Sequence, residues 1–213
     1  MEIFIIFSAK ILAAPLLLLK ITSVNKQQGY LAGKMLIAAP SMGDPRFAQT
    51  LLYMCAHDEH HAMGIIINQP MHILRFPTLL KQLGIDTENT TPPDMPVLSG
   101  GPVDPERGFV LHSLEYNKPE ETTPVTDNIG LSASKEILLA MASDDPPKQC
   151  LLALGLSSWI AGQIEFELEQ NAWLVCEADD ELLFDQEFAS KWNRAMFKIG
   201  VDPDRFSHTT GHA

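Results

Sequence analysis

Short apolar runs separated by polar turns dominate the first half of the domain and predict a buried β-sheet. The runs lie at 35–38, 51–56 and 63–68, and the third is rich in β-branched residues, which favour strands. A five-residue polar link at 57–61 joins the second run to the third. Two runs of this length across so short a link predict a β-hairpin at the centre of the sheet.

Helical periodicity alternates with further apolar runs in the rest of the chain. Apolar spacing and capping residues predict helices at 78–83, 132–142, 161–171 and 187–199. Short apolar runs predict strands at 97–98, 107–113, 149–156, 173–176 and 182–184. Polar stretches at 86–96 and 117–124 predict loops. The pattern indicates a domain built from both helices and strands.

The break Gly100-Gly101-Pro102 stands between two predicted strands and is followed by Arg107. Glycine has no Cβ and tolerates positive φ, so the backbone can approach a neighbouring strand or a ligand closely at this point. The break is either an anion-binding nest with Arg107 supplying positive charge, or only a tight crossover between strands. The glycine spacing matches neither the P-loop nor the Rossmann fingerprint.

The polar link at 57–61 holds three histidines and two acids: His57, Asp58, Glu59, His60 and His61. Adjacent side chains diverge in a hairpin turn and the H-E-x-x-H spacing is absent, so we predict a surface turn and no metal site. His57 is a separate case, because it ends a buried strand where neighbouring loops also arrive. There it could donate a hydrogen bond or titrate near neutral pH.

Two other polar patterns give little support for catalysis. Ser157 follows Gly155 as in a nucleophile elbow, but Trp159 occupies the position of the second glycine. Glu165 and Glu169 share one side of the helix predicted at 161–171, and without a nearby histidine or cysteine they indicate a solvated face.

Composition narrows the range of partners. With 213 residues, 46% of them hydrophobic and 20% charged, the chain can bury a full core. Its formal net charge of −12 disfavours direct nucleic-acid binding, because phosphate binding depends on Lys and Arg. Cys55, Cys150 and Cys176 are widely spaced within apolar runs, which is typical of reduced thiols in a cytoplasmic protein.

The N-terminal segment differs from the rest. Residues 1–19 are strongly apolar, but Glu2 precedes the apolar stretch and Lys10 interrupts it, which argues against a signal peptide or a spanning helix. A targeting role stays open beside the alternative of an extension that is disordered or loosely packed. We expect residues 1–28 to be this extension, residues 29–213 to be the domain, and no association with membranes.

Ordered motifs along the chain resemble those of the YqgE/AlgH family of bacterial proteins. They lie at 36–40, 44–47, 57–58, 62–70, 100–103, 107–113, 159, 162–165, 171–174, 184–185, 192 and 200–202. The resemblance covers 31–213 and implies an α+β fold: a single compact domain with a mixed, largely antiparallel sheet flanked by helices. His61 departs from the family, which usually has glycine there, and residues 1–28 have no counterpart.

Three functional hypotheses follow, in order of preference. The resemblance implies a regulator of transcription, which we expect to act indirectly through a protein or a small-molecule partner. The alternatives are a hydrolase-like enzyme with His57 or His112 as general base, and a direct DNA-binding regulator. No cofactor, metal or catalytic residue is predicted. The candidate binding residues, expected to meet around one cavity at the strand ends, are His57, Asn68, Gly100, Gly101, Pro102, Arg107 and His112.

Overall fold

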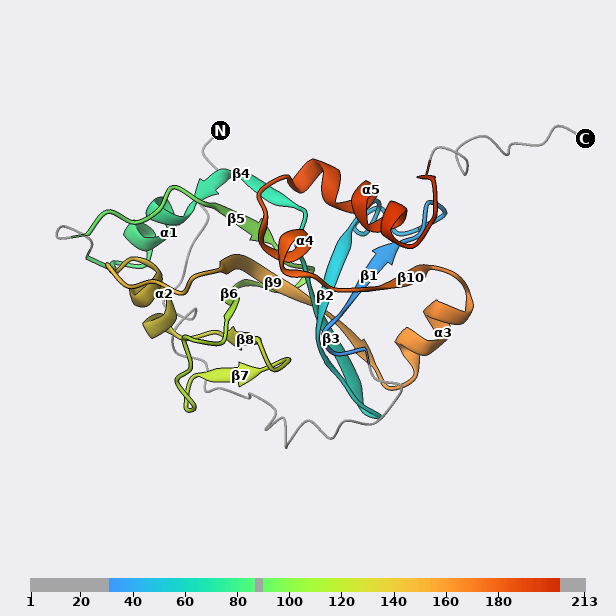
Figure 1. The fold of residues 1–213 in the computed structure, drawn as a ribbon, viewed down its shortest axis with the longest axis horizontal. Coiled ribbons are helices and arrows are strands. Elements are labelled where there is room, and N and C mark those ends of the chain that lie inside the picture. The colour runs from blue at the N-terminus through green and yellow to red at the C-terminus, as the bar shows by residue number, and fades with distance from the viewer. Residues whose placement is uncertain (1–30, 87–89, 204–213) are drawn as a thin grey trace, which may run out of the picture.

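The structure is a computed structural model that describes residues 31–86 and 90–203, and Figure 1 shows its elements. The strands are β1 (Lys34–Ala38), β2 (Leu51–His57), β3 (His61–Ile66), β4 (Pro70–Arg75), β5 (Pro96–Ser99), β6 (Val103–Ser113), β7 (Thr122–Pro124), β8 (Ile129–Ser132), β9 (Cys150–Ile160) and β10 (Trp173–Glu177). The helices are α1 (Phe76–Gln82), α2 (Lys135–Met141), α3 (Gln163–Glu169), α4 (Asp180–Phe184) and α5 (Phe188–Lys198). The predicted extension at 1–28 lies outside the described residues.

A curled, mixed sheet forms the centre of the fold. Its strands follow the order β10-β1-β2-β3-β9-β6-β8-β7, and β5 joins it by pairing with both β4 and β9. β5 runs parallel to β9, whereas the pairs along the main order are antiparallel. The predicted hairpin is confirmed, with Tyr53 of β2 opposite Ile65 of β3. The fold is therefore α+β, as the family resemblance implied.

Helices cover both faces of this sheet (Figure 1). Because side chains alternate along a strand, Met35 and Ile37 of β1 join the core under α4 and α5, while Leu36 and Ala38 join the opposite core that includes Ile164 of α3. A further core on this second face packs α1 and α2 against β6 and β9. In the part of the chain that the structure describes, no helix is both long enough and apolar enough to cross a membrane.

One predicted strand, at 182–184, is wrong. Residues 180–184 form α4, and the Asp179 carboxylate caps this helix by accepting the backbone N–H of Leu182 at 2.7 Å. A three-residue apolar run has too little periodicity to separate a strand from a helical turn, so the cap and the tertiary packing of Leu182 and Leu183 decide. The structure also has β7 at the end of the segment predicted as a loop at 117–124.

A bulge in β6 opposite Gly155 shapes the middle of the sheet. Val103 pairs with Leu156 and Gly108 pairs with Leu154, so the four residues 104–107 of β6 face the single residue Gly155 of β9. Gly155 has φ +74°, and a Cβ on it would lie 2.5 Å from the carbonyl oxygen of Gly101. A Cβ on Gly101 would lie 2.3 Å from the Leu156 backbone. Glycine is required at both positions because two backbones cross there.

Candidate functional site

A cavity of about 440 Å³ opens on the same sheet face as α4 and α5, over a part of that face that these helices do not cover. Its walls come from β3, β6 and β9, and single residues of β2, β7, β8 and α3 complete it. The volume is in the range of small-molecule sites in proteins.

The floor of the cavity is the outer end of the core beneath α4 and α5. Phe109, Leu131 and Leu156 are buried members of that core, and Met63 and Ala133 pack against it. The helix α5 contributes its core side chains at the β1–β2 side of the sheet, and α4 packs beside α5. The apolar surface that they do not reach becomes the floor of a site.

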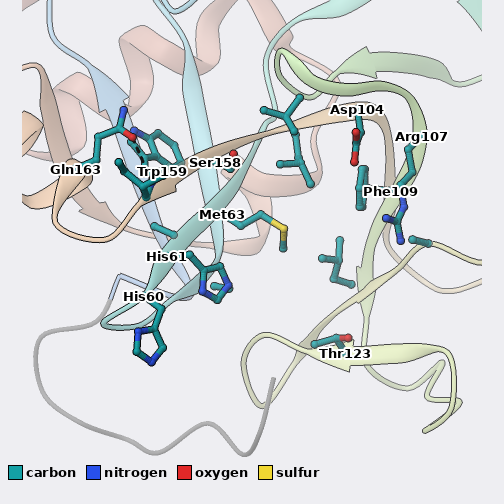
Figure 2. Close-up of a pocket in the computed structure, with 17 residues that line it drawn as sticks. His60, His61, Met63, Asp104, Arg107, Phe109, Thr123, Ser158, Trp159 and Gln163 are labelled. Carbon is teal, nitrogen blue, oxygen red and sulfur yellow. Dashed lines mark hydrogen bonds between the residues drawn. The ribbon is translucent and has the colours of Figure 1, made fainter. Parts of the chain in front are cut away.

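The bulge in β6 brings two charged residues to the cavity. Asp104 and Arg107 both line it, and Figure 2 shows Arg107 and Met63 approaching it from opposite walls. Asp104 has φ +47°, a left-handed conformation that is uncommon outside glycine, which is a mark of the bulge. The Arg107 guanidinium carbon lies 5.2 Å from the centre of the Phe109 ring, within range of a cation–π contact.

Arg107 differs in its pairing from the other arginines that the structure describes. Arg46 pairs with Asp44, Arg75 with Asp94, and Arg194 with Asp185 and Glu181. Among the residues that the structure describes, Arg107 is the arginine without a carboxylate within 4 Å. Its guanidinium is therefore available to an anion in the cavity.

The β2–β3 turn supplies the opposite rim. The ring Nδ1 of His61 lies 3.0 Å from a carboxylate oxygen of Asp58, and Asp58 also accepts the backbone N–H groups of His60 and His61. Partial burial acts to raise the pKa of Asp58, but these backbone hydrogen bonds and the His61 ring outweigh it and hold the pKa below its usual value. The ionised Asp58 thus orients the His61 ring, which lines the cavity.

The seven candidate residues do not meet at one cavity in the structure. Arg107 lines the cavity and the other six do not. His57 is turned away, with its ring 5% exposed: Nδ1 accepts the backbone N–H of Leu31 at 3.1 Å, and Nε2 donates to Glu165 at 2.7 Å. Asn68 links two backbone segments, accepting from the N–H of Leu51 and donating to the carbonyl of Gln49.

The remaining candidates lie within or beside the strands. Gly100 and Gly101 pack against the backbone of β9 in the close crossing, and Pro102 is exposed. His112 is fully buried, accepts from the Ser132 hydroxyl at Nε2 and donates to the Ser113 carbonyl at Nδ1. Burial lowers the pKa of His112, so its ring is neutral at neutral pH. It lies on the opposite face from Phe109, because positions 109 and 112 differ by an odd number along β6.

The bulge also decides which serine faces the cavity. Leu151 and Ala153 point into the core beneath α4 and α5, and simple alternation would give Ser157 the same direction. The irregular backbone at Gly155 shifts the alternation by one residue, so Leu156 and Ser158 take that face. Ser157 is buried on the other side, and its hydroxyl has no hydrogen-bond partner among the described residues.

One signal for this site is present in the sequence itself. Residues two apart on a strand share a face, so Arg107 and Phe109 form a cation–aromatic pair that periodicity alone could have detected. Met63 and Ser158 had no such signal, because their convergence depends on the pairing of β3 with β9. In the two described ranges, no group of three His, Cys, Asp or Glu side chains is arranged to hold a metal ion.

Comparison with known proteins gives consistent similarities in sequence. A family profile described as AlgH-like matches residues 35–204. A UPF0301 protein of Caulobacter vibrioides is 47% identical over 185 residues, which cover 86% of this chain and 94% of the relative. A UPF0301 protein of Bradyrhizobium diazoefficiens is 46% identical over 191 residues, which cover 87% of this chain and 89% of the relative.

Solved structures are similar as well. The solution structure of the AlgH protein from Pseudomonas aeruginosa has a TM-score of 0.70 at 36% identity, and the match covers 90% of this chain and all of that one. A crystal structure of a Corynebacterium diphtheriae protein has a TM-score of 0.62 at 18% identity, covering 81% of this chain and 88% of the other. The second likeness concerns the fold alone.

Proposed function

The chain belongs to the AlgH-like family, and from this premise we propose that it is a regulatory protein that acts through a partner and senses a small molecule in the cavity between β3 and β6. The observation that carries the proposal is the cavity itself. It combines a floor of apolar core side chains with a few polar groups, among them Arg107, Asp104, His61 and Gln163. Sites for small molecules have this composition, in which apolar walls supply affinity and polar groups fix orientation.

Any effect on transcription is proposed to be indirect. The formal net charge of −12 opposes the approach of a nucleic-acid backbone. Three of the four described arginines are already paired with carboxylates of the same chain. We propose instead that a protein partner recognises the ligand-bound form and carries the effect on transcription.

A cytoplasmic location forms part of the same proposal and draws support from the cysteines. Cys55, Cys150 and Cys176 are free thiols. Burial raises the pKa of Cys150 and of Cys176 to about 11, so both remain protonated and weakly reactive at neutral pH. Unreactive buried thiols are typical of proteins in a reducing compartment.

The hydrolase alternative gains no support from the two histidines named for it. His57 and His112 hydrogen-bond to groups of the fold at separate places in the sheet, and neither ring lines the cavity. A general base must lie within hydrogen-bond reach of a substrate proton.

Thermal-shift screening of the full chain against metabolites tests the proposal. We expect at least one compound to stabilise the folded state, by about 2.7 kcal/mol when its concentration is 100 times its dissociation constant. Ser158→Phe should abolish the stabilisation, because position 158 is exposed and faces the cavity, so that an aromatic ring would fill it. Val175→Phe, at an exposed position on the edge strand β10, is the matched control.

Two results would count against sensing at this site. One is the absence of stabilisation by any compound across a broad metabolite collection. The other is stabilisation that Ser158→Phe and Val175→Phe leave equally intact, which would place the ligand elsewhere.

A further inference from the structure

We propose that the cavity binds a small amphipathic carboxylate, with its carboxylate on Arg107 and its hydrocarbon part on the apolar floor. This inference rests on the proposed function, because it assumes that the cavity holds a small molecule, and it names the chemical class of that molecule.

The position of Arg107 indicates an anion. The guanidinium is half-buried at the cavity wall and is held against the Phe109 ring, while the other described arginines are neutralised by carboxylates. A planar guanidinium fork fixed in one orientation matches a planar carboxylate through two parallel hydrogen bonds. Fixing the side chain on an aromatic ring also lowers the entropy lost when an anion binds.

The floor indicates a hydrocarbon part. Phe109, Leu131 and Leu156 present apolar surface to the same cavity as the guanidinium, and Met63 of β3 packs against the same core. Methionine is unbranched and adapts its shape to an apolar guest. A ligand that is ionic throughout would leave this surface in contact with water.

The charge balance at the bulge indicates a single negative charge. Asp104 lines the same cavity three residues from Arg107 and is exposed, so it opposes a second negative charge on the ligand. One guanidinium beside one carboxylate of the protein suits a monoanionic carboxylate better than a phosphate dianion.

The test compares ligands that differ only in the head group. Octanoate, octanamide, octylammonium and octyl phosphate are titrated into the full chain by calorimetry, below the concentrations at which they form micelles. We expect octanoate to bind about tenfold to a hundredfold more tightly than octanamide, the usual effect of a hydrogen bond to a charged group. Arg107→Met should remove this preference and leave octanamide binding unchanged.

Two further variants separate the binding role from general effects. Arg46→Met removes the same charge from an exposed arginine that pairs with Asp44 outside the cavity, and should leave octanoate binding unchanged. Arg107→Gln keeps hydrogen-bond donors without the charge and gives a second variant if Arg107→Met folds poorly. It should lose most of the octanoate preference.

Several outcomes would overturn the inference. They are equal affinity for octanoate and octanamide, an octanoate preference that survives in both Arg107 variants, tighter binding of octyl phosphate or octylammonium, and no binding of any of the four. In each case the proposed function is judged separately, because a screening compound whose effect Ser158→Phe abolishes would still occupy the cavity.

Discussion

At the scale of single residues, Lys191 stands out because its ammonium group is fully buried. Nζ donates to the carbonyl oxygens of Leu182 and Leu183, each at 2.8 Å, and lies 3.7 Å from a carboxylate oxygen of Asp185. These contacts tie the start of α5 to α4. Burial lowers the pKa of Lys191 from 10.5 to about 8, and the nearby Asp185 carboxylate only partly opposes this effect. A neutral amine still has two hydrogens for the two carbonyl groups.

Stability should therefore depend on pH through Lys191. Between about pH 8 and 10.5 the unfolded chain keeps this proton while the folded chain loses it, so the free energy of unfolding rises with pH. We expect the free energy of unfolding of wild type minus that of Lys191→Met to increase by up to about 1.4 kcal/mol per pH unit in this interval. Urea unfolding at a series of pH values measures it.

Urea unfolding of Lys198→Met at the same pH values is the control, because this variant also loses one positive charge from α5. The prediction would be contradicted if the free energy of unfolding of wild type minus that of Lys191→Met stayed level or fell from pH 8 to 10. Below about pH 8 the charged group is buried in full, and its unfavourable contribution should be at its maximum.

At the scale of elements, the crossing of the Gly100–Gly101 segment over β9 shapes the cavity wall. The crossing lies directly behind the bulge that carries Asp104 and Arg107. The sequence allowed either an anion-binding nest or a tight crossover at the double glycine. In the structure the double glycine forms a tight crossover, and it acts through its backbone. It positions the residues that line the site without lining it.

The crossing predicts a large difference between two glycine variants. Gly155→Ala should destabilise the fold by about 2 to 5 kcal/mol, because it adds the strain of a left-handed alanine to a backbone clash 2.5 Å from the Gly101 carbonyl. Gly84→Ala, where φ is +64° but a Cβ meets nothing within 4 Å, should cost only about 1 to 2 kcal/mol. Denaturant unfolding measures both, and equal losses would mean that the crossing is looser than described.

At the scale of the whole molecule, acidity is the dominant property. A formal charge of −12 over 213 residues repels polyanions at long range, and several of the Lys and Arg side chains that the structure describes are already ion-paired within the fold. In the cavity, Arg107 offers a local positive charge inside an acidic protein. The protein can therefore bind a small monoanion at Arg107 while its net charge repels nucleic acid.

Direct DNA binding should accordingly be absent. In gel-shift measurements at low salt, where phosphate contacts are strongest, we expect no retained complex with the gene's own upstream region or with a random duplex. A basic DNA-binding protein under the same conditions serves as the positive control. Tight binding that weakens steeply with added salt would contradict the proposal of indirect action.

Much of the fold was accessible from local patterns. The hairpin of β2 and β3, the helices near 78–83, 132–142, 161–171 and 187–199, and the α+β class all follow from hydrophobic periodicity, caps and family motifs. The errors arose where a pattern was too short, as at α4, or where a strand has little apolar signal, as at β7.

The site was much less accessible, and the physical reason is the irregular backbone at Gly155. By itself the sequence determined most of the strands, the acidity, the free thiols and the presence of Arg107 two residues before an aromatic residue. Only the tertiary structure decided that His57 and His112 turn away from the cavity while Met63 and Ser158 line it. A one-residue shift in a strand exchanges its two faces, and that shift depends on which backbone segments cross in space.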